Sequence, residues 1–286
     1  MLKINSGHRL KRFPSWLRQS VRTDAGVAET KGLLRELNIN TVCQDARCPN
    51  IYDCFSRKKC TFLILGNLCT RSCGFCAIET RRDPALPDKE ELFSIKEAVR
   101  RLGAKEIVIT SVTRDDLDDG GAGHFADCVG ILRQADAGLG IEVLVPDFLG
   151  KADPIEKVVF AGPDIFSHNI ETVPRIYNKV RPQAAYQRSL DVIRYAKGLD
   201  RGILTKSGLM AGLGETRQEI REVMQDLKDA GCDIITIGQY LRPVPRCLEV
   251  KEFLHPDEFN RFSAWAEEIG FTRSSCSPFT RSSYLM

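Results

Sequence analysis

The sequence predicts an α/β fold, a partial (β/α)6 barrel of the TIM type with N- and C-terminal extensions. Short apolar runs alternate with amphipathic helical patterns, and the alternation repeats at the spacing of βα units. Consecutive units of this kind give parallel strands joined by right-handed crossovers, and fewer than eight strands favours an open barrel. The six candidate strands are Thr61–Gly66, Ile107–Ser111, Ile141–Pro146, Ile165–His168, Gly202–Ser207 and Ile234–Gly238.

The helices between these strands have recognisable starts. Ser94 with Glu97, and Thr216 with Glu219, have the spacing of a capping box, and each pair precedes apolar residues that share one helical face. Asp153–Pro154 is expected to open a further helix as N-cap and first residue. A fourth helix is predicted by apolar residues at helical spacing, namely Phe125, Cys128, Val129 and Leu132.

Barrel enzymes have their active sites at the carboxyl ends of the strands, so we expect functional residues in the loops that follow each apolar run. The sequence contains no low-complexity stretch and no linker rich in proline or serine. We therefore expect one core, with an N-terminal extension over residues 1–58, a barrel over 59–245 and a C-terminal extension over 246–286.

Length and composition exclude several classes of protein. A chain of 286 residues can bury a single large core, and a net charge of +3 gives no reason to expect nucleic-acid binding. No apolar run approaches the ~18 residues of a membrane span. The chain has 11 cysteines, an odd number in a chain that is not small, which favours metal-binding thiols in a reducing cytoplasm over a secreted disulfide scaffold.

The first part of the chain is basic and contains no acidic residue before Asp24. An organelle transit peptide has this composition, but a solvated basic arm is the favoured interpretation. A docking surface for an acidic partner is a third. The basic residues are Lys3, Arg9, Lys11, Arg12, Arg18 and Arg22.

Six cysteines fall in two triads. In the second triad, Cys69-x3-Cys73-x2-Cys76, three thiolates from a single loop can converge on one face of an iron–sulfur cluster. Zinc is the alternative, but zinc sites usually have paired knuckles and four ligands. An electron-transfer ferredoxin would have a longer run of four cysteines. Three ligands on a four-iron cluster leave one iron open, and Phe75 can shield the cluster.

The first triad is Cys43-x4-Cys48-x5-Cys54, and it precedes the first strand. Taken alone, it is also compatible with a zinc turn. Beside the second triad, a second iron–sulfur cluster is the better prediction, and its segment must lie outside the barrel proper.

A polar segment, His168-Asn169-x-Glu171, follows the fourth strand. In an extended segment Asn169 and Glu171 lie on the same side, where an amide and a carboxylate can hold the two hydroxyls of a ribose. An ordinary polar loop is the alternative. Arg181 and Arg188 are candidates to bind a carboxylate of the same ligand. The acidic turn Asp115–Asp119 is interpreted as solvated.

The C-x3-C-x2-C spacing resembles that of the radical S-adenosylmethionine superfamily, and the two triads together resemble the lipoyl synthase family. The resemblance covers almost the whole chain. It includes Pro14–Leu17, Thr61–Gly66, Arg114–Ala122, Val145–Phe148, His168–Arg175, Val180–Pro182, Lys206–Glu215, Gly238–Leu241 and Arg281–Tyr284.

This resemblance implies a partial (β/α)6 barrel that carries two [4Fe-4S] clusters. The cluster of Cys69, Cys73 and Cys76 would cleave S-adenosylmethionine to methionine and a 5′-deoxyadenosyl radical. The cluster of the first triad would be the auxiliary cluster, completed by the oxygen of Ser283 and consumed as the sulfur source. The residues that the resemblance places at the nucleoside cofactor are Phe75, Asn169, Glu171, Arg181, Met210 and Tyr240.

The reaction implied is a sulfurtransferase reaction, the insertion of two sulfur atoms at C6 and C8 of an octanoyl chain attached to a lysine of a carrier protein. Two S-adenosylmethionines would be used per product. The partners implied are octanoylated lipoyl domains of 2-oxoacid dehydrogenase E2 subunits, the glycine cleavage H protein, a ferredoxin- or flavodoxin-type reductant and iron–sulfur assembly proteins.

Two rival functions are a biotin-synthase-like sulfur insertion into a free small molecule and an iron–sulfur carrier without turnover. The sequence departs from the family at Arg242–Pro245 and in the residues after Tyr284, which puts carrier choice or the position of the tail in question rather than cluster chemistry. We expect the remaining cysteines to have mostly structural roles, with Cys128 on a core face and Cys60 at the start of a strand. Cys232, Cys247 and Cys276 have no partner at a ligand spacing.

Overall fold

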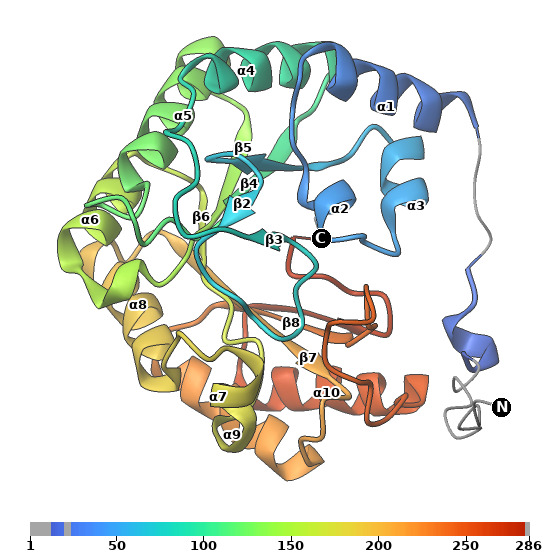
Figure 1. Cartoon of the computed structure of the whole chain (residues 1–286). Helices are drawn as coiled ribbons and strands as arrows, with labels where there is room; N and C mark the ends of the chain where they lie inside the picture. Colours follow the sequence, from blue (N-terminus) through green and yellow to red (C-terminus); the bar gives the residue numbers. More distant parts are fainter. Residues whose placement is uncertain (1–12, 20–23, 284–286) are drawn as a thin grey trace, which may run out of the picture.

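The computed structural model describes residues 13–19 and 24–283, and its centre is a sheet of seven parallel strands (Figure 1). The strands follow the order β1-β4-β5-β6-β7-β8-β9, so β1 and β9 form the two edges. The α/β barrel prediction is confirmed. The strands are β1 (Thr61–Ile64), β4 (Glu106–Ser111), β5 (Gly140–Leu144), β6 (Ile165–Ser167), β7 (Leu204–Ala211), β8 (Ile234–Gln239) and β9 (Arg273–Ser277).

Helices surround the sheet on its outer side (Figure 1). They are α4 (Glu90–Leu102), α5 (Ala122–Ala135), α6 (Ala152–Phe160), α8 (Tyr186–Leu199), α9 (Arg217–Asp229) and α10 (Pro256–Ile269). The other elements are α1 (Ala25–Glu36), α2 (Val42–Asp45), α3 (Ile51–Ser56), α7 (Tyr177–Val180), the 3-10 helices Ser15–Leu17, Phe148–Gly150 and Pro174–Ile176, and the two-stranded sheet of β2 (Leu68–Cys69) and β3 (Glu79–Thr80). No helix within the described ranges is long and apolar enough to cross a membrane.

All six predicted strands are present, but the structure adds a seventh, β9. It pairs in parallel with β8, and Cys276 lies opposite Ile237. The prediction missed this strand because its sequence, Arg273–Ser277, is polar and has no apolar run to mark it. The strand stays at an edge, where one side of its backbone needs no sheet partner.

The helix starts agree with the sequence in one case and differ in two. Thr216 and Glu219 form the predicted capping box at α9. Helix α4 instead begins at Glu90, a turn before Ser94, because the Asp88 carboxylate accepts a hydrogen bond from the Glu90 amide (3.0 Å). Helix α6 begins at Ala152, so the proline at position 154 is inside the first turn rather than at its first residue.

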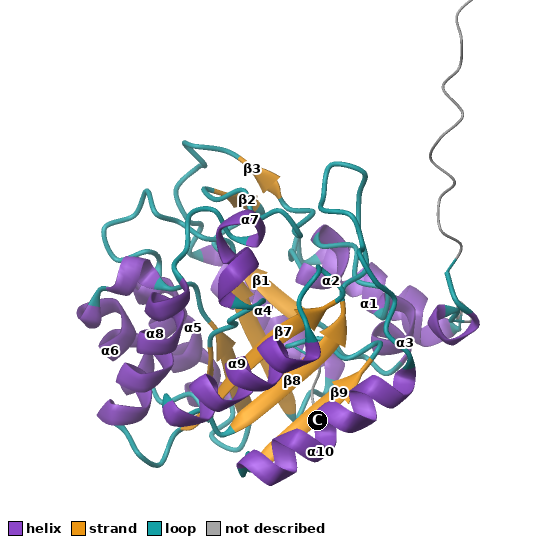
Figure 2. Ribbon diagram, turned by 90° about the horizontal axis from the view of Figure 1, so that it is seen from below, coloured by secondary structure: helices purple, strands orange, loops and turns teal. Residues whose placement is uncertain are grey.

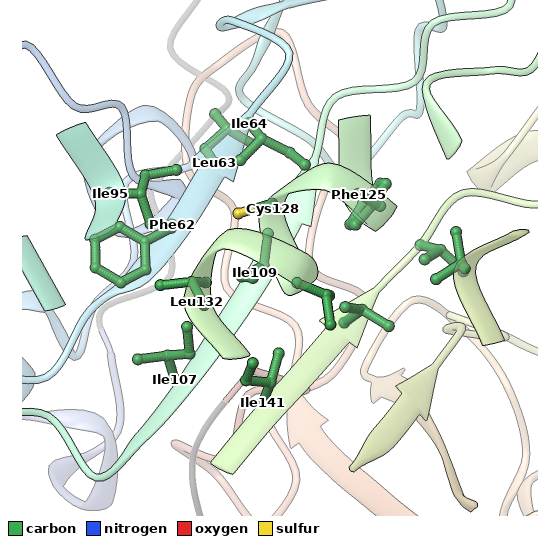
Figure 3. Close-up of a cluster of buried hydrophobic side chains, with 14 of the residues drawn as sticks. Phe62, Leu63, Ile64, Ile95, Ile107, Ile109, Phe125, Cys128, Leu132 and Ile141 are labelled. Carbon is green, nitrogen blue, oxygen red and sulfur yellow. The ribbon is translucent and has the colours of Figure 1, made fainter. Parts of the chain in front are cut away.

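One part of the core lies where the inner faces of α4 and α5 pack against β1, β4 and β5 (Figure 3). Phe62, Ile109 and Phe125 are almost completely buried there, and Cys128 packs among them as the predicted small hydrophobe. Residues of α1, α2 and α3 belong to the same buried cluster. The N-terminal helices therefore share the barrel's core, which stabilises their position against β1.

The two extensions of the chain meet beside the barrel. The backbone amide of Leu63 in β1 donates to the carbonyl of Asn40 (3.0 Å), which ties the N-terminal segment to the sheet edge. The side-chain amide of Asn50 donates to the carbonyl of Phe279 (2.7 Å), so the start of α3 is joined to the C-terminal segment. Figure 1 shows α2 and α3 next to the C-terminal end of the described chain.

Candidate active site

A cavity of about 320 Å³ lies at the carboxyl ends of the strands, where the barrel rule predicts a site. Its walls come from the loops after β1, β4, β5 and β6 and from β7, β8 and the C-terminal segment. In Figure 2, β2, β3 and α7 lie together at this end of the molecule. The sequence-predicted residues that line it are Cys48, Cys69, Cys73, Phe75, Cys76, Asn169, Glu171, Arg181, Met210, Tyr240 and Ser283.

The loop that carries the second triad is held by backbone hydrogen bonds on both sides of Gly74. The Gly74 amide donates to the Val180 carbonyl and its carbonyl accepts from the Leu248 amide, both at 2.8 Å. A β-carbon at this position would stand 3.0 Å from the Leu248 side chain and 3.1 Å from the Lys179 carbonyl. Glycine is therefore required for the close approach of these two segments to the loop.

Arg71, between the first two cysteines of this triad, is a residue that the sequence analysis missed. It is 4% exposed, and its guanidinium donates two hydrogen bonds to Asp115 (2.6 and 2.8 Å) and one to Asp147 (2.7 Å). Burial acts to raise the pKa of Asp147, but hydrogen bonding and the charge of Arg71 outweigh it and hold that pKa below the usual range. This network ties the cysteine loop to the segments that follow β4 and β5.

The acidic turn is only partly solvated, because Asp116 and Asp118 are exposed while several of its carboxylates are also held by hydrogen bonds. Asp115 is engaged by Arg71, and Asp116 accepts hydrogen bonds from the buried guanidinium of Arg114 (2.7 to 3.1 Å). Asp119 accepts hydrogen bonds from the amides of Gly121 and Gly123 and from Lys157. The turn fixes the entry to α5 because the Asp119 carboxylate satisfies two amides at that helix start.

The three thiols of the second triad are half-buried in the wall of the cavity. Burial raises the pKa of Cys73 and raises that of Cys76 to about 12, and the neighbouring thiols of the triad add to each shift. Thiolates become stable in such a place when iron neutralises their charge. Among the described residues, no three His, Cys, Asp or Glu side chains converge on a single ion, whereas the thiolates of a cubane each bind a different iron. The donor set fits an iron–sulfur cluster.

Asn169, Glu171 and Arg181 line the same cavity as the second triad. The Asn169 amide donates to Glu171 (2.9 Å), so the two side chains lie on one side as predicted. The backbone is not extended there, since Glu171 has a φ of 68°. Its backbone instead bridges to β7, where its amide donates to Gly208 and its carbonyl accepts from Met210, both at 2.9 Å.

Two buried polar atoms in this group have no partner, the Asn169 Oδ1 and the Arg181 Nε. Burial raises the pKa of Glu171, although Arg181 and Asn169 pull it down. Buried polar groups are normally satisfied, and unsatisfied ones that line a cavity mark a place for a polar ligand. An amide, a carboxylate and a guanidinium fit the ribose hydroxyls and the carboxylate of S-adenosylmethionine.

Two neighbouring residues have other tasks. Arg188 interacts with Asp147 at 3.3 Å and is not among the cavity's lining residues, so the prediction that it reaches a ligand carboxylate has no support. His168 is buried, and burial together with Arg181 lowers its pKa to about 4. Its ring contacts the Val145 carbonyl (2.9 Å) and Ser189 (3.0 Å), which anchors the end of β6.

A second, smaller cavity of about 40 Å³ contains the first triad. Cys43 lies in α2 and Cys54 in α3, and the Cys48 amide donates to the Cys43 carbonyl (3.0 Å). Burial raises the pKa of Cys43 to about 12 and that of Cys54 to about 11, and the nearby thiol of Cys48 adds to both. Ser283 lines the same cavity, so the chain brings together all four residues that the resemblance assigned to the auxiliary cluster.

The two cavities adjoin. Cys48, Arg281 and Ser283 line both of them. Arg281 provides a cation beside Cys48, which suits the negative charge of thiolate-bound iron. Ser282 accepts a hydrogen bond from Asn169 (2.9 Å), which joins the group of Asn169, Glu171 and Arg181 to the C-terminal segment. The sequence signal for this contact is the Arg281–Tyr284 segment, of which Tyr284 lies outside the described residues.

Comparison with known families agrees with this geometry. Residues 63–227 match the family described as the Radical SAM superfamily. Residues 1–48 match the N-terminal domain of lipoyl synthase of the Radical SAM family. The two matches together span both cysteine triads except Cys54.

Individual relatives match across nearly the whole chain. The lipoyl synthase of Caldicellulosiruptor saccharolyticus is 49% identical over 95% of each protein, and that of Rubrobacter xylanophilus is 51% identical over 95% of this chain and 84% of its own. Among solved structures, SuiB of Streptococcus suis bound to S-adenosylmethionine has a TM-score of 0.60 at 13% identity, covering 87% of this chain and 60% of SuiB. This similarity supports the fold. The chain belongs to the lipoyl synthase family of radical SAM enzymes.

Proposed function

We propose that the protein is a lipoyl synthase that inserts two sulfur atoms, at C6 and C8, into an octanoyl chain carried on a lysine of a lipoyl carrier protein. The observation that carries the proposal is the pair of adjoining cavities, each lined by one cysteine triad and both lined by Cys48 and Ser283. A chain in which two thiol sites share a wall can act with both on one substrate.

In the larger cavity, Cys69, Cys73 and Cys76 would hold the first [4Fe-4S] cluster. With S-adenosylmethionine bound, that cluster supplies radical chemistry able to break an unactivated C–H bond, which acid–base catalysis cannot do. Asn169 and Glu171 would orient the ribose hydroxyls. Arg181 would bind the carboxylate, and Phe75, Met210 and Tyr240 would contact the cofactor and exclude water.

In the smaller cavity, Cys43, Cys48, Cys54 and Ser283 would hold the auxiliary [4Fe-4S] cluster, which is the sulfur source. A serine oxygen is a poor match for soft iron–sulfur chemistry and would be the ligand most easily released. Arg281 would balance the charge of the site beside Cys48. Two S-adenosylmethionines would be used for each lipoyl group.

The carriers proposed are the lipoyl domains of 2-oxoacid dehydrogenase E2 subunits and the glycine cleavage H protein. A ferredoxin- or flavodoxin-type protein would supply electrons, and iron–sulfur assembly proteins would rebuild the auxiliary cluster, all in the cytoplasm. The 1–58, 59–245 and 246–286 division remains a proposal about function, with the radical source on the barrel and the sulfur source on the extensions.

The test is anaerobic reconstitution with iron and sulfide, followed by reaction with S-adenosylmethionine, a strong reductant and either octanoylated carrier or free octanoic acid. We expect about eight irons per chain, 5′-deoxyadenosine in the medium and lipoyl groups on the carrier alone, detected by mass spectrometry of the carrier peptide. Sulfur insertion into the free acid but not the carrier would reject the proposal.

A further inference from the structure

The cavity of the auxiliary site contains a fourth cysteine, Cys60. It lines the same space of about 40 Å³ as the first triad and Ser283. Its spacing does not group it with the triad, because it follows Cys54 by six residues and directly precedes β1. The structure thus places four thiols around one small cavity, together with the hydroxyls of Thr61 and Ser283.

Cys60 is placed by the sheet. Thr61, the next residue, begins β1 and pairs with Val108 of β4. The Cys60 side chain packs against the first core cluster together with Cys54. Cys60 lines the cavity together with Cys43 and Cys54, so the three residues face the same small space. Its location is therefore fixed by the barrel and does not depend on the C-terminal segment.

We propose that Cys60 is a reserve ligand of the auxiliary cluster, placed to bind the fourth iron when Ser283 is not bound to it. The inference rests on the proposed function, since it takes Cys43, Cys48, Cys54 and Ser283 as the resident ligands. A thiolate is a softer and stronger ligand for iron than a serine oxygen. The exchange also balances in protons, because the thiol releases one when it binds iron and the departing serine oxygen takes one up.

The two candidate ligands differ in their attachment. Ser283 lies in the C-terminal segment, which is joined to the start of α3 by the hydrogen bond from the Asn50 side chain to the Phe279 carbonyl. Cys60 lies at the start of a fully buried strand. A ligand on the segment can leave while a ligand on the sheet stays, so Cys60 would retain iron that the loss of Ser283 exposes.

The test uses the full chain with Cys69, Cys73 and Cys76 replaced by alanine, so that only the auxiliary site can be loaded with iron and sulfide. Mössbauer spectra distinguish an iron that has an oxygen ligand from irons with sulfur ligands only. We expect one distinct iron in four in this parent protein. The signal of this distinct iron should vanish in Ser283→Ala, because Cys60 becomes its ligand. It should return in Ser283→Ala/Cys60→Ala, where neither side chain is left to bind the iron.

A second readout is mild oxidation, which removes an iron that lacks a protein ligand and leaves a three-iron cluster visible by EPR. The three-iron signal should be several-fold stronger in the double variant than in Ser283→Ala. The matched control is Ser283→Ala/Cys276→Ala, because Cys276 is also half-buried but lines neither cavity. It should behave as Ser283→Ala does. If the alanine double variant fails to fold, Ser283→Ala/Cys60→Ser should restore the distinct iron.

The outcomes separate the inference from the function on which it rests. A parent protein that binds no cluster would reject the auxiliary site itself. A parent with one distinct iron, together with identical spectra for Ser283→Ala and for Ser283→Ala/Cys60→Ala, would reject the role of Cys60 and leave it as a packing residue.

Discussion

The two cysteine cavities differ in size and in the parts of the chain that build them. The larger, about 320 Å³, is formed by strand ends and loops, and buried ion pairs brace its cysteine loop. The smaller, about 40 Å³, is formed by two short helices, the start of β1 and a C-terminal segment. A site that must admit and release a nucleoside in every cycle needs space within a rigid frame. A site that is dismantled and rebuilt needs ligands on separate segments.

The largest expected effect separates the two sites by cysteine replacement. Cys69→Ala should reduce 5′-deoxyadenosine formation to background, because the radical source would lose a ligand. Cys48→Ala should retain some 5′-deoxyadenosine formation while lipoyl formation falls to background. Both products are measured by chromatography and mass spectrometry. Full lipoyl formation by both variants would show that neither triad has its assigned role.

The next effect concerns the brace of the larger cavity. Arg71→Gln removes the main partner of Asp147, whose side chain is fully buried, and should cost about 3–5 kcal/mol of unfolding free energy, measured by denaturant titration. Arg100→Gln breaks an exposed pair with Glu97 and should leave the unfolding free energy nearly unchanged. Equal stability of the two variants would contradict the brace.

The same ion pair predicts a dependence on pH. The folded state holds the pKa of Asp147 below its usual value, so this carboxylate stabilises the fold above about pH 4 and the stabilisation is lost as the pH falls through the lowered pKa. The wild-type protein should therefore lose stability below about pH 4. The difference in unfolding free energy between wild type and Arg71→Gln should become smaller over that range, as measured by denaturant titration at several pH values.

A smaller effect is expected at the proposed ribose-binding residues, Asn169 and Glu171. Glu171→Gln keeps the size of the side chain but removes the charge that accepts hydrogen bonds from ribose hydroxyls. It should weaken S-adenosylmethionine binding roughly 10-fold, consistent with one charged hydrogen bond of about 1.5 kcal/mol. Calorimetric titration of the reconstituted protein measures the change, and iron content should stay at the wild-type value. Unchanged affinity would remove Glu171 from the cofactor site.

The smallest effect belongs to the basic arm. Arg9, Lys11 and Arg12 lie outside the described residues, whereas Arg18 is exposed. Neutralising these three residues should raise the KM for an acidic carrier a few-fold and flatten its dependence on salt. Cleavage of S-adenosylmethionine without carrier should not change. Unaltered carrier kinetics would leave the arm as a solvated segment.

The sequence predicted what depends on apolar periodicity and on cysteine spacing. The six predicted strands each contain buried apolar residues, so their places along the chain and the end of the barrel where the site lies followed from pattern. Strand β9 was missed because pairing with β8, rather than burial, makes it a strand. Arg71 was missed because its two carboxylate partners follow at 44 and 76 residues, and no local pattern joins them.

The auxiliary site shows a similar limit. The resemblance to the family suggested Ser283, since a hydroxyl near a cluster has no spacing to identify it. That Cys60 lines the same cavity depends on how β1 packs against α2 and α3, which is a tertiary contact. The two cavities adjoin at Cys48 and also share Arg281 and Ser283 as lining residues, so this arrangement likewise depends on where the C-terminal segment lies.

The contact of Asn50 with Phe279 joins residues 229 positions apart. A ribosome makes the chain from its N-terminus, so the three cysteines of the first triad emerge long before the segment that closes their cavity. The ligands of the barrel loop and the strands around them are complete earlier. The cavity of the first triad therefore closes only after the last strand has been made, because Arg281 and Ser283 follow that strand in the chain.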